Sequence, residues 1–136
     1  MGKDRSKDYA TAAFRDFAQH GRVSRAELEQ KLYAAERKKT ASEELAVKYI
    51  KDNEPLLADI DAVWQTVIQL KQQSPDVLRA VEEVYFLYPG IPLRRNDIVM
   101  RIRFFALNEG ISERTVYFWL KKARHLFSEY LSLIHI

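Results

Sequence analysis

The amino-acid sequence predicts an all-α fold of about six or seven helices. Apolar residues recur at spacings of three and four along most of the chain, which is the periodicity of amphipathic helices. Only four glycines and four prolines punctuate the 136 residues. The sequence also has no alternating apolar runs bounded by Asn-Gly or Asp-Gly pairs, which would predict β-hairpins.

The N-terminal region, residues 1–53, is predicted to be a basic helical region. Its first helix carries an apolar stripe at helical spacing: Tyr9, Ala13, Phe14 and Phe17. This helix ends near Gly21, and a second helix starts after Ser24, which forms a capping box with Glu27. Ser42 caps a short third helix or lies inside a continuation of the second.

Residues 54–136 are predicted to form two middle helices and a C-terminal helix-turn-helix. Pro55 and Pro75 each fit the first turn of a middle helix, where the missing N–H leaves no hydrogen bond unmade. The second middle helix must end near Tyr88, because Pro89 disfavours helical geometry in the preceding residue. We expect three aromatic side chains of this segment in the core, namely Tyr85, Phe86 and Tyr88, with a partner-binding or dimer surface as the alternative.

Charge is divided unevenly along the chain, although the total is only +3. Residues 1–51 carry 12 Lys/Arg against 8 Asp/Glu, residues 52–93 carry 2 against 7, and residues 94–125 carry 8 against 3. The local net charges are therefore +4, −5 and +5. Such a division suggests that one part of the protein faces a polyanion and another part faces something else.

Residues 98–126 contain the residue types that a helix-turn-helix needs, at the required spacing. Ala106 is small enough to let two helix axes approach, and Gly110 accepts the left-handed conformation of the turn. Asn96 or Asp97 is expected to cap the first helix and Ser112 the second. The predicted inward side chains are Ile102, Phe105, Ile111, Val116, Trp119 and Ala123, with Leu120 or Leu126.

The outward side chains of the second helix predict contact with the DNA major groove. Arg114 suits guanine O6 and N7, Glu113 suits cytosine N4, and aromatic rings suit thymine methyl groups or sugars. Cations and hydroxyls farther along suit phosphates. The residues expected to contact DNA are Ser112, Glu113, Arg114, Thr115, Tyr117, Phe118, Lys121, Lys122, Arg124 and Arg101, with Arg94, Arg95 and Arg103 extending the phosphate contacts. An alternative rotation of this helix turns Phe118 into the core.

The stretch ISERTVY, residues 111–117, resembles the start of the recognition helix in region 4 of bacterial sigma factors. It is still more similar to phage late-gene transcription regulators of the ArpU/RinA type, which end in such a module after a helical N-terminal part. The resemblance covers about residues 94–127. It implies a non-enzymatic regulator of phage or prophage transcription, with RNA polymerase as a further partner. The run Arg101, Arg103 and Phe104 departs from the usual, less aromatic first helix of sigma-like modules.

The sequence is therefore compatible with three functions. The leading one is sequence-specific binding of double-stranded DNA by a transcription regulator, expected to be a homodimer because two half-sites multiply a modest affinity. In this hypothesis the acidic middle helices join two copies or meet another protein. The second is a DNA-packaging accessory, such as a small terminase-like subunit, or a recombination accessory. The third is a helical protein-interaction module without a nucleic-acid role.

Other chemistry finds little support in the sequence, and neither a cofactor nor a metal is expected. There is no Cys, and His20, His125 and His135 are not at metal-binding spacings. The start of the chain does not resemble a signal peptide, and no apolar run approaches the ~20 residues needed to cross a membrane. We therefore expect a cytoplasmic protein. Residues 131–136 resemble a translated frame of a sequencing adapter, so we expect them to be non-native, which the nucleotide sequence of the gene tests.

Overall fold

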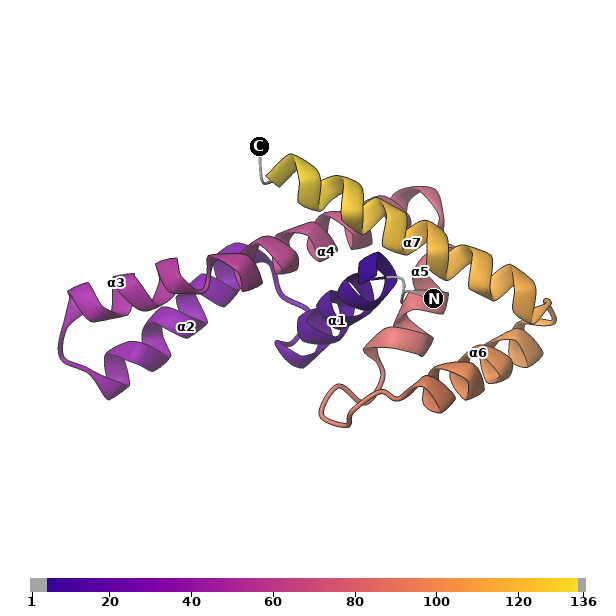
Figure 1. Ribbon diagram of the computed structural model, residues 1–136, viewed down its shortest axis with the longest axis horizontal. Helices are drawn as coiled ribbons and strands as arrows, with labels where there is room; N and C mark the ends of the chain where they lie inside the picture. Colours follow the sequence, from indigo (N-terminus) through magenta and orange to yellow (C-terminus); the bar gives the residue numbers. More distant parts are fainter. Residues whose placement is uncertain (1–4, 135–136) are drawn as a thin grey trace.

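The computed structural model describes residues 5–134 and confirms the all-α prediction, with no strand in this range (Figure 1). Seven α-helices and one π-helical turn follow in order: α1 Arg5–Gln19, α2 Arg25–Lys39, α3 Glu43–Asp52, α4 Glu54–Gln73, α5 Pro75–Val81, η1 Glu82–Phe86, α6 Arg95–Glu109 and α7 Glu113–Ile134. Residues 131–134 of the predicted non-native tail belong to the last turn of α7, and His135 and Ile136 lie outside the described residues. No helix within 5–134 is long and apolar enough to cross a bilayer.

Helix α7 lies along α4, and α1 packs against both of them and against η1 (Figure 1). Aromatic side chains fill the centre of this assembly. The Phe14 ring stacks on Tyr85 with centroids 5.4 Å apart and lies 5.8 Å from Phe127. Phe17 lies 5.5 Å from Phe86. Because such rings bury large apolar areas, this cluster contributes strongly to the tertiary stabilisation of the helices.

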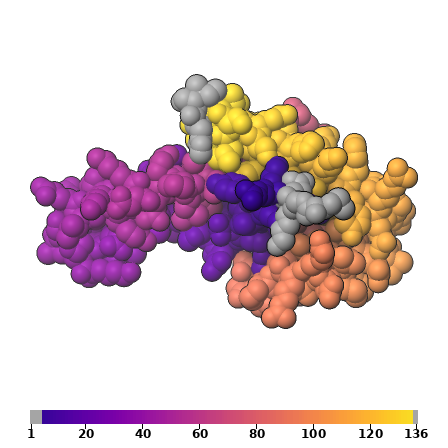
Figure 2. All heavy atoms as spheres, in the orientation of Figure 1, coloured from indigo at the N-terminus to yellow at the C-terminus, as the bar shows by residue number. Residues whose placement is uncertain are grey.

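The core includes α1, so it crosses the boundary that the sequence suggested between residues 53 and 54. Helices α2 and α3 form an arm that projects from the rest of the molecule (Figures 1 and 2), and Leu28 of α2 joins the arm to the core. They are two separate helices, since the Ser42 hydroxyl accepts a hydrogen bond from the Leu45 N–H at 3.2 Å and starts α3. The expected Ser24 cap is also present, with the Glu27 N–H donating to its hydroxyl at 3.3 Å.

Two arginines hold the segment that connects η1 to α6. The Arg15 guanidinium donates four hydrogen bonds of 2.6–2.9 Å to backbone carbonyls of this segment, namely those of Tyr85, Leu87, Tyr88 and Ile91. Arg101 donates to the carbonyls of Val84 and Leu87 at 3.0 and 2.9 Å. These carbonyls lie in the last turn of η1 or just beyond it, where no intrahelical N–H is available to them. The two side chains therefore take the place of a helix cap and fix the position of α6.

Tyr88 was expected in the core, and this expectation is wrong. Its side chain is 65% exposed, and its backbone has a positive φ of 52°. The chain reverses direction here before Pro89, which turns the ring outward while Tyr85 and Phe86 remain buried. The Arg101 guanidinium lies over the Tyr88 ring, 5.6 Å from its centroid.

Candidate nucleic-acid interface

The turn between α6 and α7 has the geometry that the sequence predicted. Gly110 adopts the left-handed conformation, with φ 68° and ψ 33°. Its N–H donates to the Leu107 carbonyl at 3.3 Å, and the Ile111 N–H donates to the Ala106 carbonyl at 3.0 Å. This pair of bonds is the Schellman motif, which satisfies carbonyls at the end of a helix. The turn therefore stops α6 and redirects the chain within three residues.

Ser112 caps α7, as predicted. Its hydroxyl accepts the Thr115 N–H at 3.1 Å and lies 2.9 Å from the Thr115 hydroxyl. The start of α6 differs from the prediction, which placed the cap at Asn96 or Asp97. The helix begins at Arg95, and the Asp97 carboxylate, three residues past Arg94, accepts the Arg94 N–H at 3.0 Å. Asp97 thus stabilises this end from inside the first turn.

One face of α7 packs into the core. Val116, Leu120 and Ala123 are buried on it, and Phe127 continues the same series one turn later. Trp119 and Leu126 are only half-buried beside this face, where they pack against the core. The opposing side chains from α6 are those expected: Ile102, Phe105 and Ala106. The prediction stopped at Leu126 and missed Phe127, although the spacing of four, three and four from Val116 onward indicates it.

The opposite face of α7 carries an exposed stripe, which we call the α7 stripe: Arg114, Phe118, Lys121 and His125. Phe118 is 67% exposed, so the alternative rotation that turned it into the core is wrong. Within residues 5–134, Arg114 and Lys121 make no hydrogen bond or ion pair, although both sit on a rigid helix. Both cations are therefore available to an external anion.

Several other residues expected to contact DNA are engaged within the protein. Glu113 pairs with Arg103 of α6, with Oε1 and Nε 3.1 Å apart, and both side chains remain largely exposed. The Lys122 ammonium donates to the Ser74 hydroxyl at 3.2 Å, at the junction of α4 and α5. Arg124 donates to the Tyr85 hydroxyl at 2.9 Å, in a half-buried position. These contacts tie the first turn and the middle of α7 to neighbouring helices. They leave Arg114 and Lys121 as the cations of this helix that have no hydrogen bond or ion pair within residues 5–134.

Arg101, expected to contact phosphates, instead lies on the side of α6 that faces η1. Its guanidinium is occupied by the two carbonyls of the connecting segment. Arg15 lies close enough that burial, together with the charge of Arg101, lowers the pKa of the Arg15 guanidinium. Sequence spacing could not show this, since the partners of Arg15 lie about 70 residues away along the chain.

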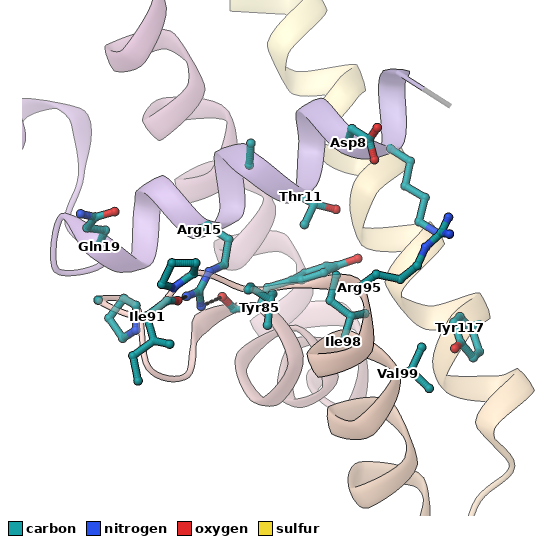
Figure 3. Close-up of a pocket in the computed structure, with 16 residues that line it drawn as sticks. Asp8, Thr11, Arg15, Gln19, Tyr85, Ile91, Arg95, Ile98, Val99 and Tyr117 are labelled. Atoms are coloured by element: carbon teal, nitrogen blue, oxygen red, sulfur yellow. Dashed lines mark hydrogen bonds between the residues drawn. The ribbon is translucent and has the colours of Figure 1, made fainter. Parts of the chain in front are cut away.

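Tyr117 lies at the edge of an open groove of about 1010 Å³ between α1, the 89–93 segment and α6. Arg95 and Lys7 line the same groove. Figure 3 shows Arg95 extending from α6 toward the first turns of α1, and Tyr117 nearby on α7. The groove thus adds positive charge beside the α7 stripe. No sequence signal linked Lys7 to this site, because only the packing of α1 brings it there.

Comparison with protein-family profiles, with curated protein sequences and with solved structures finds no match to this chain. Within residues 5–134, no group of three or more His, Asp or Glu side chains is placed to hold a metal ion.

Proposed function

We propose that the protein binds double-stranded DNA, with the first half of α7 in the major groove, and that it regulates transcription. One observation carries the proposal: Arg114 and Lys121 are exposed, make no hydrogen bond or ion pair within residues 5–134 and lie on one face of a capped, core-anchored helix. An exposed cation with no internal partner contributes little to folding, so both side chains can bind an external anion without loss of an internal contact. The segment 94–125 has a net charge of +5, which favours a polyanion.

The dimensions of the α7 stripe suit this role. Arg114 and Lys121 are seven residues apart, which on an α-helix is about 10 Å, or roughly three base-pair steps. Arg114 lies in the first turn of α7, the part of a recognition helix that reaches base edges. Its planar guanidinium matches the paired acceptors of guanine. Lys121, two turns later, is placed for a phosphate, which fixes the orientation of the protein rather than the sequence that it prefers.

The aromatic side chains fit the same arrangement. Phe118 lies between Arg114 and Lys121 on the α7 stripe, and Tyr117 flanks it at 43% exposure. Apolar contact with thymine methyl groups suits such positions in a major groove. On the Tyr117 side, Arg95 and Lys7 are placed for one DNA strand. On the other side, Lys122 lies at the α4–α5 junction, where its ammonium can exchange Ser74 for a phosphate.

The proposed role in transcription rests on the resemblance of residues 111–117 to region 4 of bacterial sigma factors and to phage late-gene regulators. The cap, the turn and the outward Arg114 of that stretch have the geometry such a module requires. The Glu113–Arg103 ion pair is exposed and therefore weak, so Glu113 can leave it to accept from cytosine N4.

Selection of preferred sites from a random DNA pool, followed by titration of the selected site and of random DNA, tests the proposal. We expect Arg114→Ala to weaken binding to the selected site by about 1–3 kcal/mol and to change binding to random DNA little. Lys121→Ala and Lys122→Ala should weaken both and reduce the salt slope by about one each. Arg37→Ala is the matched control, because it removes the same charge from the end of α2, on the projecting arm.

The results separate the competing functions. Unchanged binding by Arg114→Ala and Lys121→Ala would reject the placement of α7 in the groove. No binding of the wild-type protein to DNA at low salt would favour a protein-interaction module. Equal loss in Arg37→Ala and Lys121→Ala would indicate a diffuse electrostatic attraction without a defined site.

A further inference from the structure

The outer face of α6 is apolar although it is exposed to solvent. Ile102, Phe105 and Ala106 point inward, so the side chains half a turn away point outward. Three of these are Met100, Phe104 and Leu107, with exposures of 43%, 57% and 75%. The neighbouring connecting segment adds Leu87, Tyr88 and Ile91, which are 39%, 65% and 61% exposed. We call these six residues the α6 face.

The α6 face consists of a ridge and a groove side by side. Met100, Phe104 and Leu107 form a ridge along the helix. A groove of about 520 Å³ lies between α6 and the end of α5 and η1, and it is lined by Leu87, Tyr88, Ile91, Met100 and Phe104. A ridge next to a groove of similar character is the shape that a twofold axis can pair with itself, each ridge entering the other copy's groove.

The α6 face is held rigid. Tyr88 has a positive φ of 52°, which is unfavourable for an aromatic residue. Two guanidinium groups hold it there: Arg15 donates to its carbonyl, and Arg101 lies over its ring. Arg15 binds the carbonyls on both sides of the reversal, from Tyr85 to Ile91, as Figure 3 shows. Backbone strain that the surroundings enforce is typical of functional surfaces. A surface ordered in advance also loses less conformational entropy when it binds.

We propose that the α6 face is the contact surface for a second copy of this chain. From the exposed fractions, its side chains offer about 600 Å² of accessible apolar surface, near the roughly 800 Å² per partner of a standard protein interface. A contiguous apolar patch of this size is at the upper limit for monomeric proteins. In a dimer with twofold symmetry, the ridge and the groove of both copies are covered at once. A partner that fits only the groove or only the ridge leaves the other half of the patch exposed.

The charges around the α6 face favour a second copy of the chain, rather than DNA, as the partner of this face. The groove rim carries both signs: Arg79 and Arg101, and Glu83, Asp97 and Glu109. Arg79 and Glu109 form an ion pair across the groove. A rim of mixed sign, with two cations and three carboxylates, allows two copies to approach with little net repulsion, whereas two α7 stripes, each with Arg114 and Lys121, repel one another. The α6 face therefore differs from the earlier expectation that the acidic middle helices join two copies.

The mass of the full-length chain in solution, measured by sedimentation across a concentration series without DNA, tests the proposal. We expect a monomer–dimer equilibrium for the wild-type protein. Phe104→Ser combined with Leu107→Ser should raise the dissociation constant by about 100-fold or more, because these are the most protruding side chains of the ridge. Phe118→Ser is the matched control, since it removes an equally exposed aromatic from α7, and it should leave the dimer intact.

Thermal melting shows whether each variant is folded, and we expect all of them to melt close to the wild-type protein under monomeric conditions because the altered side chains are exposed. A wild-type protein that is monomeric at the highest concentrations would overturn the proposal. A dimer that survives the double substitution, or a larger ring, would overturn it as well. Since no DNA is present, these outcomes are independent of the proposed DNA binding.

Discussion

The hydrogen bonds of Arg15 yield the sharpest prediction about stability. Arg15→Met keeps the aliphatic stem and removes the guanidinium, and with it four hydrogen bonds to the backbone between Tyr85 and Ile91. Only the bond to the Tyr85 carbonyl is partly buried, and the other three carbonyls are exposed. A hydrogen bond from a charged donor contributes about 1.5–3 kcal/mol when its partner cannot be rehydrated, and exposed ones contribute a few tenths.

The expected loss is therefore about 2–3 kcal/mol in the free energy of unfolding, or roughly 8 °C in melting temperature for a chain of this size. Urea and thermal denaturation followed by circular dichroism measure both quantities. Hydrogen exchange of the 87–93 amides should also speed up in the variant, because the segment loses its anchor to α1. Arg5→Met removes the same charge from an exposed position of α1 and should cost almost nothing.

A loss below about 1 kcal/mol in Arg15→Met would refute the reasoning, since water would then satisfy all four carbonyls as well as the guanidinium does. If the unfolding free energy falls by about 2–3 kcal/mol but the amide hydrogens of residues 87–93 do not exchange faster, the stabilisation by Arg15 would act elsewhere in α1. Reduced dimerisation in this variant, with the α6 residues intact, would connect the rigidity of the segment to the second-copy surface.

Two further predictions concern the turn and the pH dependence of stability. Gly110→Ala should cost about 1–2 kcal/mol in unfolding free energy and weaken DNA binding, because the added Cβ meets no atom but the left-handed φ of 68° is unfavourable for alanine. Gly90→Ala, also in open space but without a positive φ, should be neutral or slightly stabilising, and equal effects would contradict the assignment of strain. Burial raises the pKa of the Asp16 carboxyl, which the charge of His20 partly opposes, so ionised Asp16 destabilises the fold at neutral pH. Asp16→Asn should therefore raise the unfolding free energy at pH 7 by less than about 1 kcal/mol, and with it the melting temperature. The gain should vanish below the ordinary carboxyl pKa, because Asp16 is then protonated in both the folded and the unfolded chain. A lower melting temperature at pH 7 would contradict the cause given for the shifted pKa.

The two proposed surfaces lie on the two helices of one hairpin, and the fold keeps them apart. Helices α6 and α7 pack against each other, with Phe105, Ala106 and Val116 buried, so their outer faces point away from one another. One carries cations without internal partners and the other carries apolar side chains. The Arg15 and Arg101 contacts fix α6, and the Schellman turn at Gly110 fixes α7 relative to α6. A change in the connecting segment is therefore expected to reach both surfaces.

Most of the helices and several of their ends could be predicted from the sequence because they depend on neighbouring residues, whereas the start of α6 and the π-helical turn η1 were not predicted. Ser24, Ser42 and Ser112 bind N–H groups three residues ahead, and Gly110 supplies the one backbone geometry that its turn requires. The alternation of buried and exposed positions on α7 follows from the 3.6-residue period alone. The outward orientation of Arg114 and Lys121 was predicted in the same way, whereas the orientation of Phe118 stayed open and was decided by the structure, in which it is 67% exposed.

The partners of charged groups could not be predicted, because they are set by packing between distant segments. Arg101 and Arg114 are the same residue type on adjacent helices, yet one binds carbonyls of η1 and the next segment while the other faces solvent. Tyr88 is as apolar as Tyr85, but the chain reversal before Pro89 turns it outward. The sequence by itself determined most of the helices, several of their caps and the basic outer face of the last helix, since these follow from local hydrogen bonds and periodicity. Only the tertiary structure decided which cations remain available and that an apolar face of α6 stays uncovered, since both depend on how α1 and η1 pack.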